Sequence, residues 1–146
     1  MKLILDTNIY VEASRSEEAR ARFRATFVPL LPVTFLAAVV AYELRVNAAD
    51  SATVGLIEDL VDRLQRSGRV VTPSFSDWTE ASEVVASIAG GDPGWKTKLP
   101  ALLNDILIAL SARQIGATVV TYNVRDFQLI RRHKEFSLRA VAPGGR

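Results

Sequence analysis

The sequence predicts an α/β fold with a mostly parallel central sheet of about four to five strands and helices on both of its faces. Short apolar runs alternate along the chain with longer segments that have helical spacing of apolar residues. The short runs carry few polar residues, which is typical of strands buried on both faces. No repeat or linker divides the chain, and its 146 residues suit one domain over 1–146.

In the first half of the chain, length and apolar spacing separate strand candidates from helix candidates. Lys2–Leu5 is a short apolar run, and the polar residues after it favour the start of a short helix at Asp6. Leu31–Thr34, after a proline, is the second strand candidate. Three longer segments have apolar residues three or four positions apart and are expected to be helices: Ser16–Phe27, Leu36–Val46 and Ser51–Arg66.

The second half continues the alternation. Val70–Thr72 is a short apolar strand candidate, and a helix is expected over Ser76–Ile88. This helix is expected to lack a capping box, because Thr79 and not an acid stands three residues after Ser76. Gly90–Leu99 is expected to be a loop. The remaining expected elements are a helix over Pro100–Ile115, a strand over Thr118–Thr121, a short helix from Arg125 and an edge strand over Phe136–Val141.

Composition excludes several functional classes. The chain has no cysteine and one histidine, so disulfides, thiolate metal sites, cysteine nucleophiles and multi-histidine metal sites are excluded. Glycine-rich phosphate loops of the GxxxxGK[ST] and GxGxxG types are absent. Apolar residues make up 49% of the chain, which excludes a disordered protein. Because no signal peptide or membrane span is recognisable, we expect a soluble, cytoplasmic protein without membrane association.

Three acidic residues stand out because each is an isolated charge in an apolar stretch. Asp6 follows the first expected strand, and Glu43 and Asp105 lie within expected helices. A fourth acid, Asp126, comes shortly after the strand that ends at Thr121. Burying a carboxylate without a partner costs several kcal/mol. One or two divalent cations would satisfy these acids together, and oxygen ligands without histidine or thiolate favour Mg²⁺ or Mn²⁺.

Each acid also has a purely structural interpretation. Asp6 can cap a helix, Glu43 can pair with Arg45 or sit at a helix edge, and Asp105 can be buried against an arginine. Asp126 can be a solvated acid in the first turn of a helix. The structural interpretations fit poorly together, since Arg45 is the only base in the matching apolar runs.

Four motifs resemble those of the PIN-domain nucleases, and within them the chain is most similar to the VapC-type toxins of bacterial toxin–antitoxin pairs. The motifs are Leu5-Asp6-Thr7-Asn8, Tyr42-Glu43-Leu44, Asn104-Asp105 and the segment from Thr121 to Phe127. The resemblance implies a PIN-like domain that acts as a metal-dependent endoribonuclease. The reaction implied by the resemblance is hydrolysis of phosphodiester bonds in single-stranded or structured RNA, which leaves 5′-phosphate and 3′-hydroxyl ends.

The resemblance also implies roles for particular residues. The catalytic and metal-binding residues are expected to be Asp6, Glu43, Asp105 and Asp126, with Asp6 and Asp105 holding the principal Mg²⁺ or Mn²⁺. The polar residues around them are expected to be Thr7, Asn8, Thr121 and Asn123. Two partners follow from the resemblance besides RNA: a second copy of the chain in a homodimer, and an antitoxin whose C-terminal segment covers the acidic groove.

Basic residues flank the acids along the chain. Arg20 and Arg24 follow Asp6, and Arg131 and Arg132 follow Asp126. They can bind RNA phosphates, or they can be the solvated faces of two helices. Trp95, in the expected loop, can stack on a base or pack against the protein. Without the four site acids the chain carries 18 bases and 12 acids, a net charge of +6, which suits RNA or an acidic partner.

Three alternative functions remain open. The first is a catalytically silent PIN-like module that binds RNA or regulates, although such a module has no need for four acids. The second is a housekeeping RNA-processing ribonuclease. The third is a phospho-acceptor or phosphohydrolase domain with Asp6 as the nucleophile. Those folds use a second aspartate two residues on or a nearby lysine, whereas this chain has Asn8 there and no lysine between Leu3 and Trp95.

Overall fold

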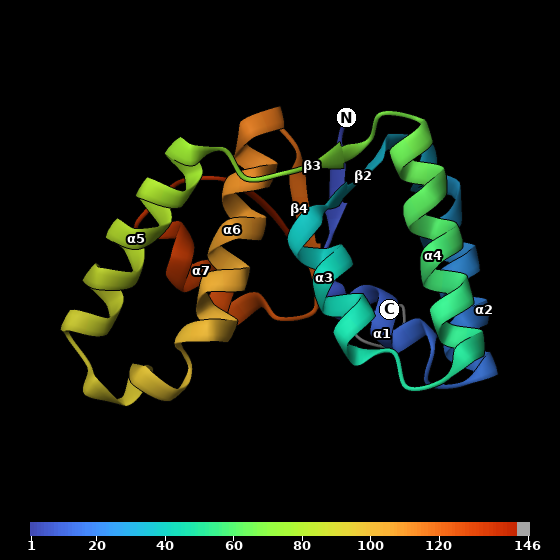
Figure 1. Cartoon of the computed structure of the whole chain (residues 1–146), viewed down its shortest axis with the longest axis horizontal. Helices are drawn as coiled ribbons and strands as arrows, with labels where there is room; N and C mark the ends of the chain where they lie inside the picture. The colour runs from blue at the N-terminus through green and yellow to red at the C-terminus, as the bar shows by residue number, and fades with distance from the viewer. Residues whose placement is uncertain (143–146) are drawn as a thin grey trace.

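The computed structural model describes residues 1–142, whose centre is a five-stranded sheet with every neighbouring pair of strands parallel (Figure 1). The strand order is β3-β2-β1-β4-β5. The strands are β1 (Leu3–Leu5), β2 (Thr34–Ala37), β3 (Val70–Val71), β4 (Thr118–Thr121) and β5 (Ser137–Ala140). The predicted α/β class and mostly parallel sheet are confirmed. The last four residues of the predicted domain 1–146 lie outside the described residues.

Helices connect the strands throughout. Within residues 1–142, the α-helices are α1 (Thr7–Ala13), α2 (Glu17–Thr26), α3 (Ala38–Asn47), α4 (Ser51–Arg66), α5 (Phe75–Gly90), α6 (Leu99–Ile115) and α7 (Val124–Arg131). Two short 3-10 helices, η1 (Val28–Val33) and η2 (Pro93–Thr97), complete the connections. No helix among these described residues has the length and apolar character needed to cross a membrane.

The side chains of β1 divide the core into two parts. Successive residues of a strand face opposite sides of the sheet. Ile4 therefore packs into a large cluster with side chains of α3 to α7, whereas Leu3 and Leu5 pack into a smaller cluster with Ile9 of α1 and Phe27 after α2. Helices thus cover both faces of the sheet, as predicted.

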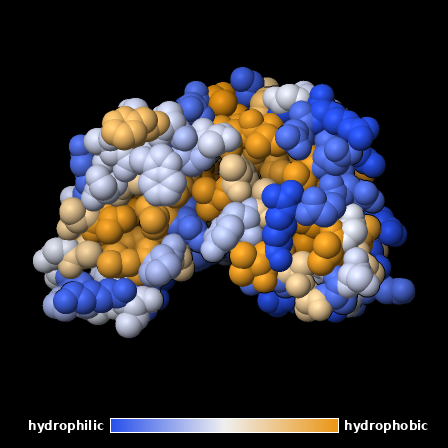
Figure 2. Space-filling model, in the orientation of Figure 1, coloured by the Kyte–Doolittle hydropathy of each residue, from blue (hydrophilic) through white to orange (hydrophobic). Residues whose placement is uncertain are grey.

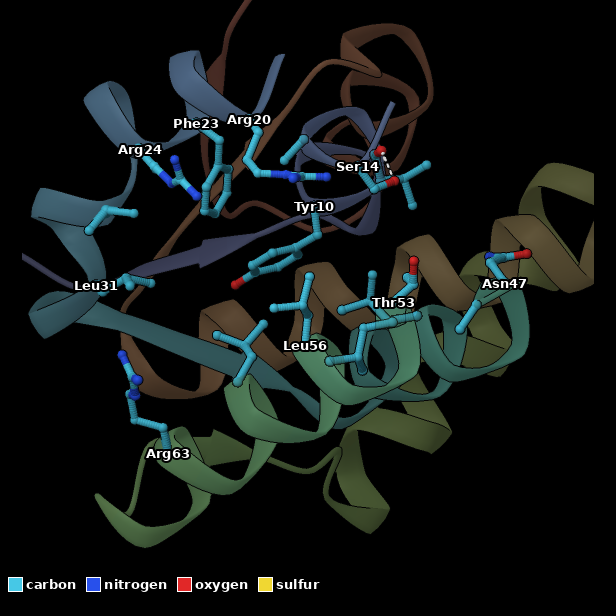
Figure 3. Close-up of a pocket in the computed structure, with 17 residues that line it drawn as sticks. Tyr10, Ser14, Arg20, Phe23, Arg24, Leu31, Asn47, Thr53, Leu56 and Arg63 are labelled. Atoms are coloured by element: carbon cyan, nitrogen blue, oxygen red, sulfur yellow. Dashed lines mark hydrogen bonds between the residues drawn. The ribbon is translucent and has the colours of Figure 1, made fainter. Parts of the chain in front are cut away.

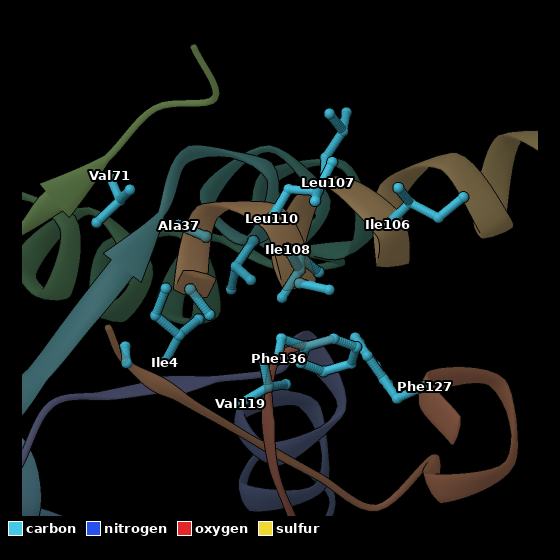
Figure 4. Close-up of a cluster of buried hydrophobic side chains, with 14 of the residues drawn as sticks. Ile4, Ala37, Val71, Ile106, Leu107, Ile108, Leu110, Val119, Phe127 and Phe136 are labelled. Carbon is cyan, nitrogen blue, oxygen red and sulfur yellow. The ribbon is translucent and has the colours of Figure 1, made fainter. Parts of the chain in front are cut away.

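Helix α6 lies at the centre of the larger cluster. Figure 4 shows Ile108 and Leu110 of this helix beside Ile4 and Val119 of the sheet. Consecutive residues Ile106–Ala112 are all buried, so the helix is enclosed on nearly every side. A helix that is apolar around its circumference belongs inside a protein. The first half of α6 carries Asp105, which is therefore held by a rigid central element.

Large apolar side chains remain exposed on α3 and α5. Tyr42 and Val46 of α3 and Phe75 and Trp78 of α5 are exposed, Phe75 by 88%. Figure 2 shows apolar surface on the face of the molecule that carries these helices. Exposed apolar surface of this kind often marks a contact with another protein.

The strand predicted at Leu31–Thr34 is wrong in its position. Residues Val28–Val33 form η1, and β2 begins only at Thr34. Pro29 and Pro32 explain the shift, because proline has no N–H to donate to a strand ladder. The prediction that the next helix begins at Leu36 is wrong for a related reason, since Leu36 is paired with Val70 of β3.

The region from Ser74 to Leu99 also differs from expectation. Helix α5 begins at Phe75 and has a capping box: Ser74 Oγ accepts from the Asp77 N–H at 3.0 Å, and Asp77 Oδ2 accepts from the Ser74 N–H at 2.9 Å. The prediction placed the capping serine two residues too late, at Ser76 in place of Ser74, and so compared Ser76 with Thr79. The expected loop Gly90–Leu99 contains η2, and α5 extends to Gly90.

We predict that Ser74→Ala destabilises the protein by about 1 kcal/mol, because it removes an N-cap hydrogen bond. The matched control is Ser76→Ala, two residues further on at an exposed position of the same helix. It is expected to change the free energy of unfolding by less than about 0.5 kcal/mol. Urea unfolding followed by circular dichroism measures both values. Equal effects of the two substitutions would contradict the assignment of Ser74 as the cap.

Candidate active site

The site forms where the chain changes direction across the sheet. From β1 the chain passes to β2 and β3 on one side, and it then returns to β4 and β5 on the other. The carboxyl ends of β1 and β4 are therefore neighbours at the switch point, where α/β sheets form their ligand crevices. The Asp6 N–H donates to Val120 O at 2.9 Å, which fixes the backbone just beyond β1 against β4.

Asp6 is buried immediately after β1 and both of its carboxylate oxygens accept hydrogen bonds. Oδ1 accepts from the Thr7 N–H at 2.8 Å, and Oδ2 accepts from Thr121 Oγ1 at 2.7 Å. The first bond makes Asp6 the N-cap of α1. The structural interpretation of Asp6 is thus correct, and the same carboxylate also faces the switch point.

Thr121 links the polar residues that follow β1 and β4. Its hydroxyl donates to Asp6 and accepts from Asn8 Nδ2 at 3.3 Å and from the Asn123 N–H at 2.8 Å. A hydroxyl has one proton to donate and two lone pairs, so its capacity is filled. The structure therefore brings together Asn8, Thr121 and Asn123, three of the predicted polar residues.

Glu43 projects from α3 toward the same place. Its Oε1 accepts from Thr7 Oγ1 at 2.7 Å, and its Oε2 accepts from Asn104 Nδ2 at 3.3 Å. Thr7, the fourth predicted polar residue, therefore joins the first and second acids. Sequence reasoning did not include Asn104 among the site residues, although its place beside Asp105 on α6 was a usable signal.

The structural alternatives for Glu43 and Asp126 are corrected in part. Arg45 pairs with Glu58 of α4 at 2.8 Å and not with Glu43. Asp126 lies in the first turn of α7, as its structural interpretation proposed, but it is partly buried and accepts from Asn123 Nδ2 at 3.0 Å.

Asp105 is the electrostatic centre of the site. Burial, followed by the negative charges of Asp6, Glu43 and Asp126, raises the pKa of Asp105 to about 8. No ion pair within residues 1–142 includes Asp105, so the alternative of an arginine partner is also wrong. The other three predicted acids therefore lie within electrostatic range of Asp105, and we refer to the four together as the acidic cluster.

The pKa of Asp6 is also raised. Burial raises the pKa of Asp6 to about 6, with a contribution from Glu43, against the hydrogen bonds from Thr121 and Thr7, which favour the ionised form. Both Asp6 and Asp105 thus retain protons well above the ordinary range of aspartate. A nearby cation would reverse this tendency by stabilising the carboxylates.

The chemistry of the cluster fits a hard divalent cation, since its donors are carboxylate, hydroxyl and amide oxygens. The spacing of the side chains is more open than in a preformed metal cage. Within the described part of the chain, no three His, Cys, Asp or Glu side chains are arranged closely enough to hold a metal ion. Hydrogen bonds from Thr7, Thr121 and Asn123 already orient three of the carboxylates, which is how proteins position ligands before a metal binds.

The four predicted arginines lie in two places. Arg132 lines a groove of about 760 Å³ that also includes Asp126, whereas Arg131 is exposed and lies outside the groove's lining. Arg20 and Arg24 line a different cavity, of about 510 Å³. Their roles in binding RNA stay predictions.

The cavity beside Arg20 and Arg24 is mostly apolar. Figure 3 shows it between α1 and α2 on one side and α4 on the other, with Tyr10 projecting from α1 toward Leu56. The Tyr10 hydroxyl is buried and has no hydrogen-bond partner within residues 1–142. Burial raises the pKa of Tyr10 above its usual range. An unpaired buried hydroxyl costs free energy.

With the fold and site described, comparison with known proteins identifies the class. The family model of the PIN domain matches residues 3–132, and the chain therefore belongs to the PIN domain family. All four clustered acids lie inside the matched range. Membership of this family indicates a nuclease-type protein. A comparison with curated proteins found no match.

Solved structures share the fold over nearly the whole chain. A DNA-bound VapBC from Salmonella typhimurium is 21% identical with a TM-score of 0.60, covering 96% of this chain and 98% of that one. FitAcB from Neisseria gonorrhoeae is 18% identical with a TM-score of 0.61, covering 93% and 95%. A FitAB bound to a DNA fragment is 19% identical with a TM-score of 0.63, covering 94% of each chain.

We predict that, with metal chelated, the free energy of unfolding falls as pH rises from about 4 to about 8. The folded-state pKa values of Asp6 and Asp105, about 6 and about 8, exceed the ordinary value of 3.8. Over this range the folded protein therefore holds protons that the unfolded chain has lost. Asp105→Asn should flatten the dependence above about pH 6 and raise stability at pH 8.

Urea unfolding in EDTA at pH 5, 6, 7 and 8 tests this expectation. The matched control is Asp59→Asn, which changes an exposed aspartate of α4 outside the cluster and should retain the slope of the wild type. An unchanged slope in Asp105→Asn would show that this carboxyl group is not the one that titrates.

Proposed function

We propose that the protein is a metal-dependent endoribonuclease that hydrolyses phosphodiester bonds in single-stranded or structured RNA. The observation that carries the proposal is the placement of Asp105 among three other acids, with no ion-pair partner within residues 1–142. Such a cluster requires a cation to be fully ionised at neutral pH. Its place at the carboxyl ends of parallel strands is where α/β proteins bind substrates.

The side chains of the cluster have distinct tasks in this proposal. Asp6 and Asp105 hold the principal Mg²⁺ or Mn²⁺, and Glu43 and Asp126 complete the site. When bound, the cation supplies positive charge to the phosphoryl group and assists deprotonation of the attacking water. The donors that contact Asp6, Glu43 and Asp126 hold the orientation of these carboxylates while they repel one another.

RNA as the substrate is supported by charge. Outside the four acids the chain carries a net charge of +6, which attracts a polyanion toward a site that is itself negative until a cation binds. A catalytically silent RNA-binding module is less well supported, because four clustered acids repel RNA and serve no purpose in binding alone. A phosphohydrolase with Asp6 as nucleophile is also less well supported, since the chain has Asn8 where those folds use a second aspartate and no lysine between Leu3 and Trp95.

We further propose that the protein is the cytoplasmic toxin of a toxin–antitoxin pair and not a housekeeping ribonuclease. Its structural relatives include VapBC and FitAB assemblies. The 510 Å³ cavity is suited to bind an antitoxin segment with apolar and acidic residues. Its lining is mostly apolar and also includes Arg20, Arg24 and Arg63. The exposed apolar side chains of α3 and α5 support a homodimer.

Purified protein is expected to cleave single-stranded RNA with Mg²⁺ or Mn²⁺ and to be inactive in EDTA. Asp6→Asn and Asp105→Asn should each lower the rate at least about 100-fold, because each removes a ligand for the cation. Asp59→Asn serves again as the matched surface control. Mn²⁺ should raise the melting temperature of the wild type and of Asp59→Asn more than that of Asp105→Asn, which measures cation binding without activity.

Three results would contradict the ribonuclease proposal. Full activity in either site variant would show that the cluster takes no part in catalysis. Metal-independent RNA binding without cleavage would favour the silent module. A covalent aspartyl-phosphate on Asp6 would favour the phosphohydrolase.

The antitoxin proposal predicts that Leu56→Asp prevents co-purification with the product of an adjacent small reading frame. Leu56 is 64% exposed on α4 and lines the cavity, so a charge there would disfavour an apolar segment. The matched control is Val54→Asp, an exposed apolar residue of the same helix outside the lining. Circular dichroism checks that both variants fold. Loss of co-purification in both variants, or in neither, would contradict the assignment of the cavity.

A further inference from the structure

A groove next to the acidic cluster has a different character from the apolar cavity. It has a volume of about 760 Å³ and lies between η2, the first turn of α6 and α7. Asp126 forms part of its wall, so the groove shares one acid with the cluster. Its chemistry-bearing side chains are Trp95, Lys98, Arg125, Gln128 and Arg132.

The charges of the groove fit an anionic ligand. Three bases, Lys98, Arg125 and Arg132, face a single acid, Asp126. Within residues 1–142 none of these three bases forms an ion pair, whereas six other bases of the chain do. Bases that lack acidic partners while standing beside a phosphodiester-cleaving site are well placed to bind the phosphates of the same strand.

The aromatic wall of the groove favours a nucleotide over a simple anion. Trp95 is partly buried and packs against the main core, which holds its indole in place. Lys98 Nζ lies 5.5 Å from the centre of the Trp95 ring, a cation–π contact that keeps a positive charge beside the aromatic surface. Single-stranded nucleic acids are bound by this combination of aromatic and basic side chains. Gln128 adds an amide that can donate to or accept from a base edge.

We propose that this groove is the subsite for a nucleotide that flanks the scissile phosphate. Arg125, Arg132 and Lys98 bind the phosphates on that side of the cut, and the base lies against Trp95 and Gln128. The η2 segment, which supplies Trp95, thereby contributes to the choice of cleavage position. This inference rests on the proposed nuclease function, because Asp126 is shared between the groove and the cluster.

The test measures binding with cleavage suppressed, so it does not depend on activity. The chain has two tryptophans, and Trp78 lies on α5 outside the groove. In a Trp78→Phe protein the fluorescence therefore comes from Trp95 alone. A single-stranded RNA of about 12 nucleotides, titrated in EDTA, should change this fluorescence on binding, since bases that contact the ring alter its emission.

Substitution of the arginines should weaken binding and lower its salt dependence. The double variant Arg125→Gln/Arg132→Gln is expected to bind the RNA at least about 10-fold less tightly. The slope of log affinity against log salt should fall by about 1.4, or about 0.7 for each phosphate that is no longer neutralised. Lys98→Gln should weaken binding in the same direction. Arg66→Gln is the charge-matched control, because Arg66 is exposed on α4 and paired with Asp62.

The possible outcomes separate this inference from the nuclease proposal. Unchanged Trp95 fluorescence, or equal RNA affinity in the double variant and the wild type, would overturn the subsite. Equal or tighter binding of a 12-residue polyglutamate would overturn it as well, by showing a site for acidic peptides. Loss of RNA affinity in the double variant would support the subsite even if Mg²⁺ and Mn²⁺ gave no cleavage, a result in which the nuclease proposal alone would fail.

Discussion

The structure depends on keeping four like-charged side chains together at a partly buried place. Repulsion between carboxylates grows as water is removed from around them. The protein meets this constraint with hydrogen-bond donors on three of the acids: Thr7 and Thr121 for Asp6, Thr7 and Asn104 for Glu43, and Asn123 for Asp126. Asp105 has no such donor within residues 1–142, and its pKa is raised by burial and, after that, by the charges of the other three acids. A bound cation would relieve this repulsion, which is why the proposed function includes one.

The architecture holds this arrangement because each acid is fixed by a rigid element. Asp6 follows the central strand, and Glu43 and Asp126 lie on helices that follow β2 and β4 on either side of it. Asp105 comes from α6, whose buried residues pack against the sheet. Strands that end at one edge, together with a helix that cannot shift without opening the core, hold the carboxylates against repulsion. Short strands are sufficient to hold the site, because the register of their pairing places the polar residues that follow them at one edge of the sheet.

The sequence carried enough information to predict the sheet class and the acidic residues, since isolated charges in apolar runs are visible without a structure. The boundaries of individual strands and helices were predicted wrongly where local sequence patterns conflicted with tertiary pairing. Leu36 has helical spacing with its successors but pairs with β3, and tertiary pairing outweighed local preference. The role of Asn104 and the groove at Trp95 could not be predicted from spacing. They depend on side chains of different elements that meet only after folding.

Proximity in sequence was the least reliable guide for the basic residues. Arg20 and Arg24 follow Asp6 closely along the chain, yet they line the apolar cavity together with α4. Helix α1 explains the separation, because its first residues contact the acidic cluster whereas Tyr10, Val11 and Ala13 face the cavity. Helix α1 therefore borders both the acidic cluster and the apolar cavity. The apolar cavity and the groove at Trp95 have no lining residue in common. The proposed antitoxin segment and the proposed RNA strand would therefore occupy separate surfaces of the protein.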